Sequence, residues 1–239
     1  MSQTLHAVAL RTVKYNDRNS ILTAWTAERG LVSMLMPAGR SRESLRRRAL
    51  TQPLSLFECV ADLHPGRELC RVSDLRAIHA FGSIHSAGMK SAVAFFIAEV
   101  LAKALRGGGD PAMWQFIVDS LCEFDAMDSR HAANFHLWFM VHLAAMLGFG
   151  PDSSEAAYGR IFDYRAGTFT ATPPISGPYA AGNDARLARI LIDSSAARLA
   201  MLRLNHSSRA AILDAILDYY AAQQLPLAPL RTLAVVCTL

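Results

Sequence analysis

The sequence predicts an α+β chain in which a small closed β-barrel precedes a mostly α-helical domain with a small β-hairpin insert. Three observations support this fold class. About 75 residues at the amino end contain five short apolar segments separated by turn-forming residues. Near Phe81-Gly82 the pattern changes, and apolar residues then recur at helical spacing. An irregular segment rich in proline and glycine, about 150–183, interrupts the helical pattern.

The five predicted strands are short and apolar, and turn-forming residues separate them. They span residues 5–12, 20–26, 31–36, 54–62 and 69–75. Gly30 closes the tight turn before the third strand, because glycine adopts a positive φ without steric cost. The number and size of the strands fit a five-stranded oligonucleotide-binding (OB) barrel, although the pattern alone also allows an SH3-like barrel.

A strongly basic stretch, residues 37–48, lies between the third and fourth predicted strands. It holds one glutamate and five arginines: Arg40, Arg42, Arg46, Arg47 and Arg48. Because apolar runs flank the stretch, we expect a polar loop that joins the two strands. Arginine presents a rigid fork of donors that fits phosphate oxygens, so this loop is the main candidate for nucleic-acid contact. The alternative is a loop that is merely solvated.

The positive charge of the chain belongs to its first third. The net charge is +4, but residues 1–80 hold twelve Lys and Arg against seven Asp and Glu, a net of +5. We expect Arg11, Lys14 and Arg67 to lie near the basic loop and to extend a DNA-binding surface on the barrel. Tyr15 and Trp25 are candidates for base stacking, and Trp25 fits a core position better.

The second part of the chain has the pattern of packed helices. In the first of them, Val93, Ile97, Leu101 and Leu105 form an apolar stripe at i, i+4 spacing. Asp110 is placed to cap the next helix. The predicted helices span residues 84–106, 112–124, 130–147, 184–192 and 207–222, and a short segment follows at 230–236. We therefore expect a barrel domain over residues 1–80 and a helical domain over residues 81–239.

The sequence favours neither an enzymatic nor a metal-dependent function. It lacks the phosphate-binding loop, the dinucleotide-binding glycine motif and the nucleophile elbow. The four cysteines are Cys59, Cys70, Cys122 and Cys237. Their scattered positions suit free buried thiols in a reducing, cytoplasmic setting rather than a metal site. We expect no cofactor and no bound metal.

Residues 131–151 carry no formally charged side chain. A helix that crosses a bilayer needs about 20 mostly apolar residues. This run instead contains three histidines and ends in Gly148, Gly150 and Pro151. It predicts a buried helix rather than a membrane span, with His136 and His142 in or beside the core.

The order of several short motifs resembles that of a known family. At the amino end these motifs are 7–12 with Tyr15, 20–23 with 28–31, the basic 37–40, and 52–54. Further on they are 147–151 and 230–233. On these motifs, the sequence resembles the RecO family of bacterial DNA-repair proteins, and the resemblance covers nearly the whole chain.

The resemblance implies an N-terminal OB barrel and a helical C-terminal domain. It also implies a recombination mediator, in the cytoplasm and associated with the nucleoid, that binds single- and double-stranded DNA and anneals complementary strands. The mediator would help to load recombinase onto DNA covered by single-strand-binding protein, in a RecF-type pathway with RecR as a partner. Many members have a four-cysteine zinc module at about 155–182, where this chain has no cysteine. We expect a hairpin at 161–170 in its place, with Phe162, Tyr164 and Phe169 packed together.

The resemblance further implies that the helical domain binds the acidic, apolar-ended tail of the single-strand-binding protein. We expect a pocket near the first and third helices whose rim carries cations for the tail carboxylates. The candidates are Lys90, Lys103, Arg106 and Arg130. The rival hypothesis is a protein-interaction scaffold, in which the barrel binds a partner protein and the basic stretch meets only water.

Overall fold

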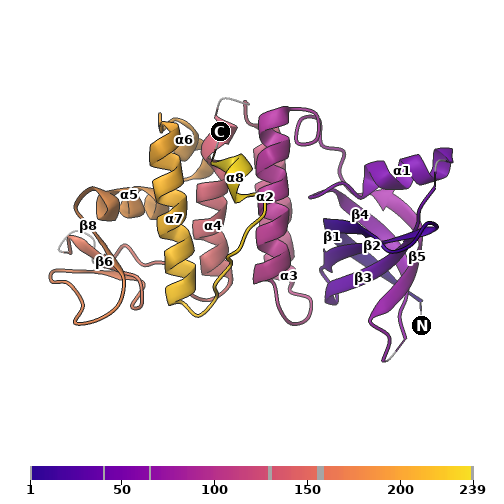
Figure 1. Ribbon diagram of the computed structural model, residues 1–239, viewed down its shortest axis with the longest axis horizontal. Helices are drawn as coiled ribbons and strands as arrows, with labels where there is room; N and C mark the ends of the chain where they lie inside the picture. Colours follow the sequence, from indigo (N-terminus) through magenta and orange to yellow (C-terminus); the bar gives the residue numbers. More distant parts are fainter. Residues whose placement is uncertain (1, 40, 65, 129–130, 155–158, 238–239) are drawn as a thin grey trace. The chain divides into compact units, whose positions relative to one another are not determined.

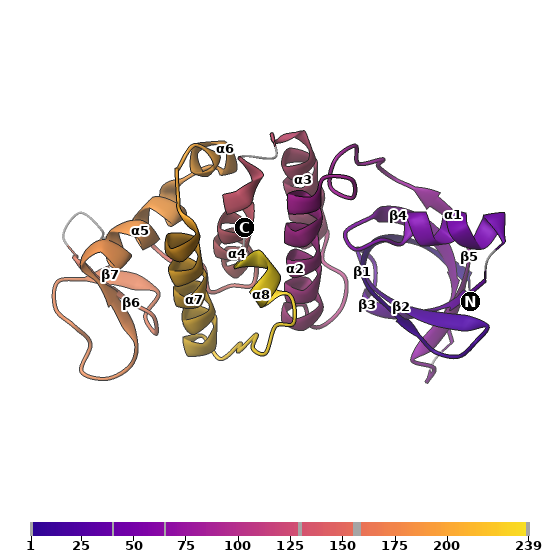
Figure 2. The same ribbon diagram turned by 45° about the horizontal axis from the view of Figure 1, so that its top comes forward.

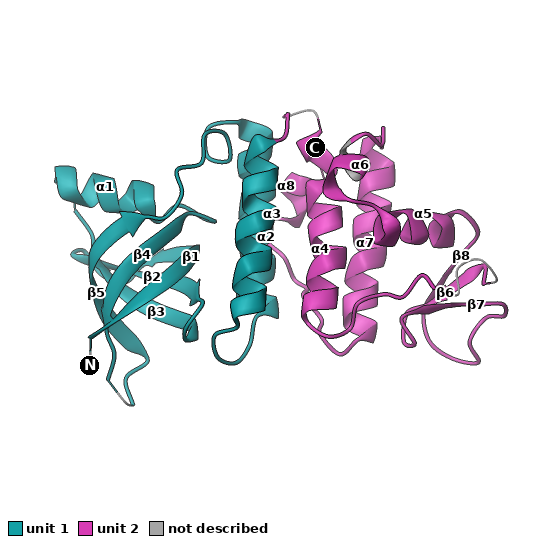
Figure 3. Ribbon diagram, turned by 180° about the vertical axis from the view of Figure 1, so that it is seen from behind, with its two compact units in different colours: residues 1–126 teal, residues 127–239 magenta. Residues whose placement is uncertain are grey.

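The computed structural model describes residues 2–39, 41–64, 66–128, 131–154 and 159–237 (Figure 1). Within it the chain forms two compact units, Met1–Ala126 and Met127–Leu239 (Figure 3). We call them the first and the second unit. The first unit contains the barrel and the two helices that follow it, so the expected domain boundary after residue 80 stays a prediction.

The barrel has the five strands that the sequence predicts. They are β1 (Ser2–Lys14), β2 (Asn19–Thr26), β3 (Gly30–Pro37), β4 (Leu56–Asp62) and β5 (Leu69–Ala77). The strands close into a ring in the order β1-β2-β3-β5-β4 (Figure 2). Only β3 and β5 pair in parallel among these neighbours. The prediction of an N-terminal five-stranded barrel is confirmed.

The barrel core follows from the alternation of side chains along each strand. On β1 the inward positions are Leu5, Ala7 and Ala9, and all three are fully buried. Cys59 and Cys70 lie in the same core as free thiols. Burial raises the pKa of Cys59 to about 12, so this thiol stays protonated and behaves as a small apolar side chain.

The basic stretch is not the loop that the sequence predicts. It forms a helix, α1 (Arg42–Leu50), which lies along the rim of the barrel (Figure 2). The Ser41 side chain caps the helix by accepting a hydrogen bond from the backbone N–H of Ser44 at 3.1 Å. Within the helix, Arg47 pairs with Glu43 one turn earlier, with 3.3 Å between Nε and Oε1. Arginine is itself a good helix former, so the density of charge does not prevent the helix.

The two helices that follow the barrel agree with their predicted patterns. They are α2 (Gly88–Ala104) and α3 (Pro111–Ala126). Asp110 caps α3, because its Oδ1 accepts hydrogen bonds from the N–H groups of Ala112 and Met113 at 2.8 and 3.2 Å. The apolar stripe of α2 is buried, as predicted.

A polar cluster joins the start of α2 to the end of α3. The Asp125 carboxylate accepts hydrogen bonds from the backbone N–H groups of Gly82, Ser83 and Ile84 at 2.8–3.0 Å. Burial alone would raise the pKa of Asp125, but these hydrogen bonds outweigh it and lower the pKa. The Lys90 ammonium donates to the Ser83 hydroxyl at 2.7 Å and to the Asp125 backbone oxygen at 2.8 Å.

Lys90 is therefore a structural residue. It is only 1% exposed, so the prediction that it lies at the rim of a surface pocket is wrong. The sequence does not reveal this burial, because one of the Lys90 acceptors belongs to Asp125, which lies 35 residues further along the chain.

The loop between α2 and α3 lies directly against the turn between β2 and β3. A Cβ atom at Gly109 would lie 2.0 Å from the backbone oxygen of Ala27. One at Gly30, where φ is +72°, would lie 2.3 Å from the backbone oxygen of Gly107. Only glycine permits so close an approach of two backbones. The contact fixes the helix pair to the barrel within the first unit.

The second unit is a helical layer beside a small sheet (Figure 1). Its helices are η1 (Ala132–Asn134), α4 (Phe135–Met146), α5 (Gly182–Asp193), α6 (Ala196–Ala200), α7 (His206–Ala222) and α8 (Leu233–Val236). The buried Tyr220 hydroxyl of α7 donates to the backbone oxygen of Met140 in α4 at 2.7 Å. None of the helices in the described residues is long and apolar enough to cross a bilayer.

The insert forms the predicted hairpin and one strand more. The hairpin strands are β6 (Ile161–Asp163) and β7 (Thr168–Thr170), and β8 (Tyr179–Ala181) pairs with the other edge of β6. The irregular segment of about 150–183 thus contains a strand, β8, that the sequence analysis did not predict. Phe162, Tyr164 and Phe169 are buried together, with ring centroids 5.0 Å apart for the two phenylalanines. The predicted packing of these three rings is confirmed.

His136 is buried in the second unit at 1% exposure. Burial, and then the charge of Arg209, lowers its pKa from 6.5 to about 3. The imidazole is therefore neutral in the folded protein at neutral pH.

The backbone contact at Gly109 yields a stability prediction. Replacing Gly109 with alanine should lower the free energy of unfolding by about 1–3 kcal/mol, since the new Cβ collides with the Ala27 carbonyl. Gly108→Ala is the matched control, because nothing lies within 4 Å of its added Cβ. Urea unfolding of both variants measures the difference. Equal stability of the two would show that the loop and the turn do not touch.

The neutral His136 yields a pH prediction. The folded pKa lies below the unfolded value, so the unfolded chain takes up the proton first. The stability contribution is complete above pH 6.5 and is lost as the pH falls from there toward 3. Between these values the free energy of unfolding should fall by up to about 1.4 kcal/mol per pH unit. His136→Asn should remove this slope, and His131→Asn, at an exposed position, should keep it.

Candidate nucleic-acid interface

The far end of β1 extends beyond the part of the barrel that β4 covers. Val8 of β1 lies opposite Leu56, the first residue of β4, whereas β1 continues to pair with β2 as far as Lys14. The end of β1 and the start of β2 thus form an arm that carries Arg11 and Lys14 on its exposed surface. The exposed turn at its tip adds Arg18, a cation that the sequence analysis did not include.

Helix α1 is held to this arm at both ends. Before the helix, the backbone N–H of Ala38 donates to the Arg18 backbone oxygen at 2.7 Å. After it, the N–H of Leu54 donates to the Ala9 backbone oxygen at 2.7 Å. The arginines of α1 and the cations of the arm therefore lie at the same end of the barrel. We call this set the α1 face: Arg11, Lys14, Arg18, Arg42, Arg46 and Arg48.

The cations of the α1 face differ in how strongly other side chains engage them. Arg42, Arg46 and Arg48 are exposed, and none forms an ion pair with a carboxylate in the described part of the chain. Arg47 is half-buried and pairs with Glu43, so it is less available to a ligand. Lys14 pairs with Asp17 at 2.7 Å, but both groups are largely exposed and such a pair is weak. Arg40 lies outside the described residues.

Arg67 does not join the α1 face. It lies in the exposed loop after β4, whereas α1 leads into the start of β4. A strand of seven residues such as β4 spans about 20 Å. The prediction that Arg67 neighbours the basic stretch is therefore wrong, although a DNA contact of its own stays a prediction. Arg76, near the end of β5 and exposed, lies at the correct end instead, and its outward place in the strand alternation was the signal for it.

The two candidates for base stacking have different environments. Trp25 is 1% exposed and stacks on Trp114 of α3, with ring centroids 6.5 Å apart. The prediction that Trp25 belongs to the core is confirmed, and its ring is not accessible to a base. Tyr15, at the tip of the arm, is 60% exposed. It is the aromatic side chain that the α1 face can offer to a base.

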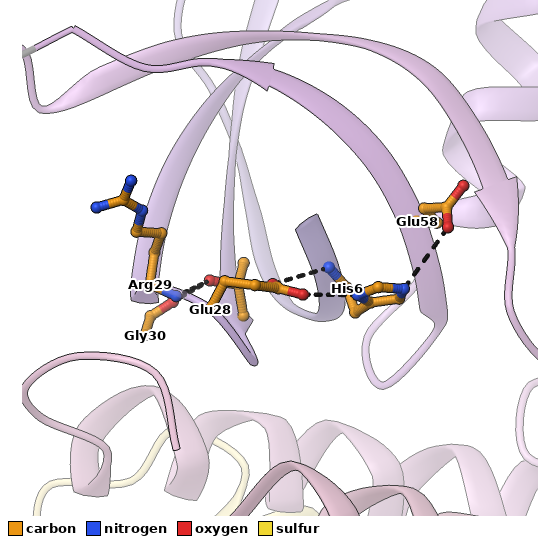
Figure 4. Close-up of polar contacts among 6 residues, drawn as sticks. His6, Glu28, Arg29, Gly30 and Glu58 are labelled. Carbon is orange, nitrogen blue, oxygen red and sulfur yellow. Dashed lines mark hydrogen bonds and ion pairs between the residues drawn. The ribbon is translucent and has the colours of Figure 1, made fainter. Parts of the chain in front are cut away.

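A polar cluster around His6 lies beside the turn between β2 and β3 (Figure 4). Glu28 accepts a hydrogen bond from the backbone N–H of His6 at 3.0 Å and contacts its ring Nδ1 at 2.6 Å. The other ring nitrogen lies 3.6 Å from Glu58. Nearby, the Arg29 N–H donates to Thr26 within the β2–β3 turn. These contacts hold the turn against β1 and give the cluster a structural role.

The residues predicted to bind a protein partner are not one cluster. Lys103 is half-buried and Arg106 exposed near the end of α2. Arg130 lies outside the described residues. Phe95 of α2, about two turns before Lys103, is 52% exposed. The sequence analysis missed Phe95, because helical spacing alone did not separate it from the buried Phe96.

The described residues contain no group of three His, Cys, Asp or Glu side chains that could hold a metal ion. The family model described as "Recombination protein O N terminal" matches residues 1–81, and "Recombination protein O C terminal" matches residues 85–234.

Curated relatives match over the same length. A protein from Porphyromonas gingivalis strain W83, named DNA repair protein RecO, is 31% identical over 98% of this chain and 97% of its own. Proteins of the same name from Bacteroides fragilis strain ATCC 25285 and Phocaeicola vulgatus are 30% and 29% identical, over 92% of this chain and 91% of theirs. Two family models that together span almost the whole chain, and relatives that match it end to end, show that this chain belongs to the RecO family.

Proposed function

We propose that this protein is a non-enzymatic, DNA-binding mediator of recombinational DNA repair. The observation that carries the proposal is the α1 face, where exposed cations gather at one end of an OB-like barrel. Membership of the RecO family, whose curated members are named DNA repair proteins, supports a role in DNA repair. A location in the cytoplasm, in association with the nucleoid, agrees with this role.

The proposed DNA contact is mainly with phosphates. Arg42, Arg46 and Arg48 stand in solvent without carboxylate partners in the described residues. Such guanidinium groups gain most by replacing the counterions of a polyanion. The phosphate backbone is common to single and double strands, so this surface suits both. Tyr15 adds a base contact that only an unstacked base can reach.

Annealing and recombinase loading extend the same proposal. Two complementary strands repel one another through their phosphates, and a cationic surface that binds both lowers this repulsion. We propose that the protein anneals strands in this way and helps to load recombinase onto DNA covered by single-strand-binding protein. In this RecF-type pathway RecR is the proposed second partner.

The proposed site for the tail of the single-strand-binding protein is on α2. Phe95 offers an exposed apolar surface for the apolar end of the tail. Arg106 and Lys103 offer cations for its carboxylates. Lys90 is excluded by its burial, and a role for Arg130 stays a prediction.

A gel shift with a single-stranded and a double-stranded oligonucleotide, at low and high salt, tests the proposed function. Binding that weakens steeply with salt supports it. If neither oligonucleotide binds at low salt while the protein is folded, the barrel is better explained as a scaffold for a partner protein.

The geometry of α1 predicts which arginines matter most. Arg46→Ala with Arg48→Ala should weaken binding to all DNA sequences and flatten the salt dependence by about two units of slope. Arg47→Ala is the matched control, with a smaller effect because Glu43 already engages Arg47. Anisotropy titrations over a range of salt measure both. If the double variant keeps the wild-type salt slope, Arg46 and Arg48 do not contact the DNA phosphates.

The tail site has its own test. Lys103→Glu with Arg106→Glu should weaken binding of a tail peptide by about tenfold, because two attractive charges become repulsive. Arg186→Glu serves as the control, because it also reverses a positive charge but at an exposed position on α5. Fluorescence anisotropy with a labelled peptide gives the affinities. Equal losses in the test and control variants would indicate a general charge effect and no site on α2.

A further inference from the structure

One arginine in the second unit is partly buried and lacks a full set of acceptors. Arg209 lies in the first turn of α7. Its Nε atom is shielded from solvent and has no hydrogen-bond partner. Its Nη1 donates to the backbone oxygen of Leu204 at 2.6 Å. No carboxylate in the described residues forms an ion pair with it. A guanidinium keeps its charge at any physiological pH, so this charge cannot be removed by losing a proton.

The space beside Arg209 is a cavity of about 620 Å³. Among the described residues, the ionisable side chains that line it are two arginines, a histidine and one aspartate: Arg203, Arg209, His131 and Asp128. Arg203 and His131 are exposed at its edge. The lining therefore has a positive balance, and the volume is ample for a polyatomic ion with its water. Nothing in the DNA-binding role of the α1 face uses this cavity.

The surroundings of Arg209 make a bound cation implausible and an anion favourable. The N-terminus of α7 lies within the same turn, and the positive end of a helix dipole attracts negative charge. His136 supplies no counter-charge, since burial and the charge of Arg209 keep it neutral. Shielding a charged N–H donor from water without giving it an acceptor is unfavourable. An oxyanion that accepts the Nε hydrogen would remove that penalty.

We propose that this cavity binds a phosphate group, with Arg209 and Arg203 as its principal ligands. Two guanidinium forks and a histidine against a single aspartate suit a dianion better than a singly charged carboxylate. Inorganic phosphate and the terminal phosphate of a DNA strand share this chemistry. The site lies in the second unit and does not depend on the α1 face. Experiments can therefore disprove the phosphate site without disproving DNA binding at the α1 face, and the reverse.

The first experiment titrates the full-length protein with sodium phosphate at constant ionic strength, with chloride as the balancing salt. The readout is the Nε–H resonance of Arg209 in a proton–nitrogen spectrum, identified by its loss in Arg209→Lys. We expect a saturable shift of this resonance and a rise in melting temperature that follows the same binding curve. A resonance that does not move, or moves equally in chloride, overturns the proposal.

Variants then locate the site. Arg209→Gln should weaken phosphate binding by roughly tenfold or more, and Arg203→Gln by several-fold. Arg186→Gln, on α5 and outside the cavity, should bind as the wild type does. Because Arg203 is exposed, Arg203→Gln keeps the test valid if Arg209→Gln does not fold. Wild-type affinity in Arg203→Gln and in any folded Arg209 variant would overturn the proposal.

A final arm separates the two sources of phosphate. Two oligonucleotides that differ only in a 5′-terminal phosphate compete against inorganic phosphate, in a protein that carries Arg46→Ala and Arg48→Ala to suppress binding at the α1 face. Stronger competition by the phosphorylated strand assigns the site to a DNA end. Equal competition by both, with phosphate binding retained, assigns it to free phosphate. Both results support the site, whereas loss of phosphate binding in this protein would overturn its independence from the α1 face.

Discussion

The parallel pairing of β3 with β5 decides where the arginines of this protein lie. In the barrel order β1-β2-β3-β5-β4, the strand β5 stands between β3 and β4. The chain leaves β3 and enters β4 at the same end of the barrel, so the connection must pass over the end of β5. Helix α1 is that connection. In this barrel the connection across the rim is a helix, and this helix carries exposed arginines.

A helix serves a cationic surface better than a loop does. The backbone of α1 is ordered before any ligand binds, so less conformational entropy remains to be lost on binding. The helical geometry places the arginines of α1 in different environments. Arg47 faces Glu43 and is half-buried, while Arg42 and Arg46, four residues apart, share an exposed face. The same four arginines in a flexible loop would repel one another into many arrangements.

Periodicity and turn chemistry were sufficient to predict the strands, because both are local. The alternation of Leu5, Ala7 and Ala9 and the glycine at position 30 identify the first three strands without knowledge of their partners. Interactions between distant residues could not be predicted. Helix α1 was hidden by its charge, since polar density resembles a loop, although Ser41 and the Glu43–Arg47 spacing were present in the sequence. Strand β8 depends on an edge of β6 that local sequence does not show.

The cations of this chain have three different environments, and only the structure separates them. Lys90 is buried, and its ammonium group donates hydrogen bonds to Ser83 and to the backbone oxygen of Asp125. Its charge is therefore satisfied within the fold. The exposed arginines of α1 are satisfied by water, and a polyanion can replace that water at little cost. The Nε atom of Arg209 is shielded from solvent and has no acceptor among the described residues. A charge in the first environment stabilises the fold, and one in the second is available to a ligand. One in the third would gain its missing acceptor from the phosphate that we propose. The acceptors within reach of a cation, rather than the number of cations in a segment, determine which of these roles it has.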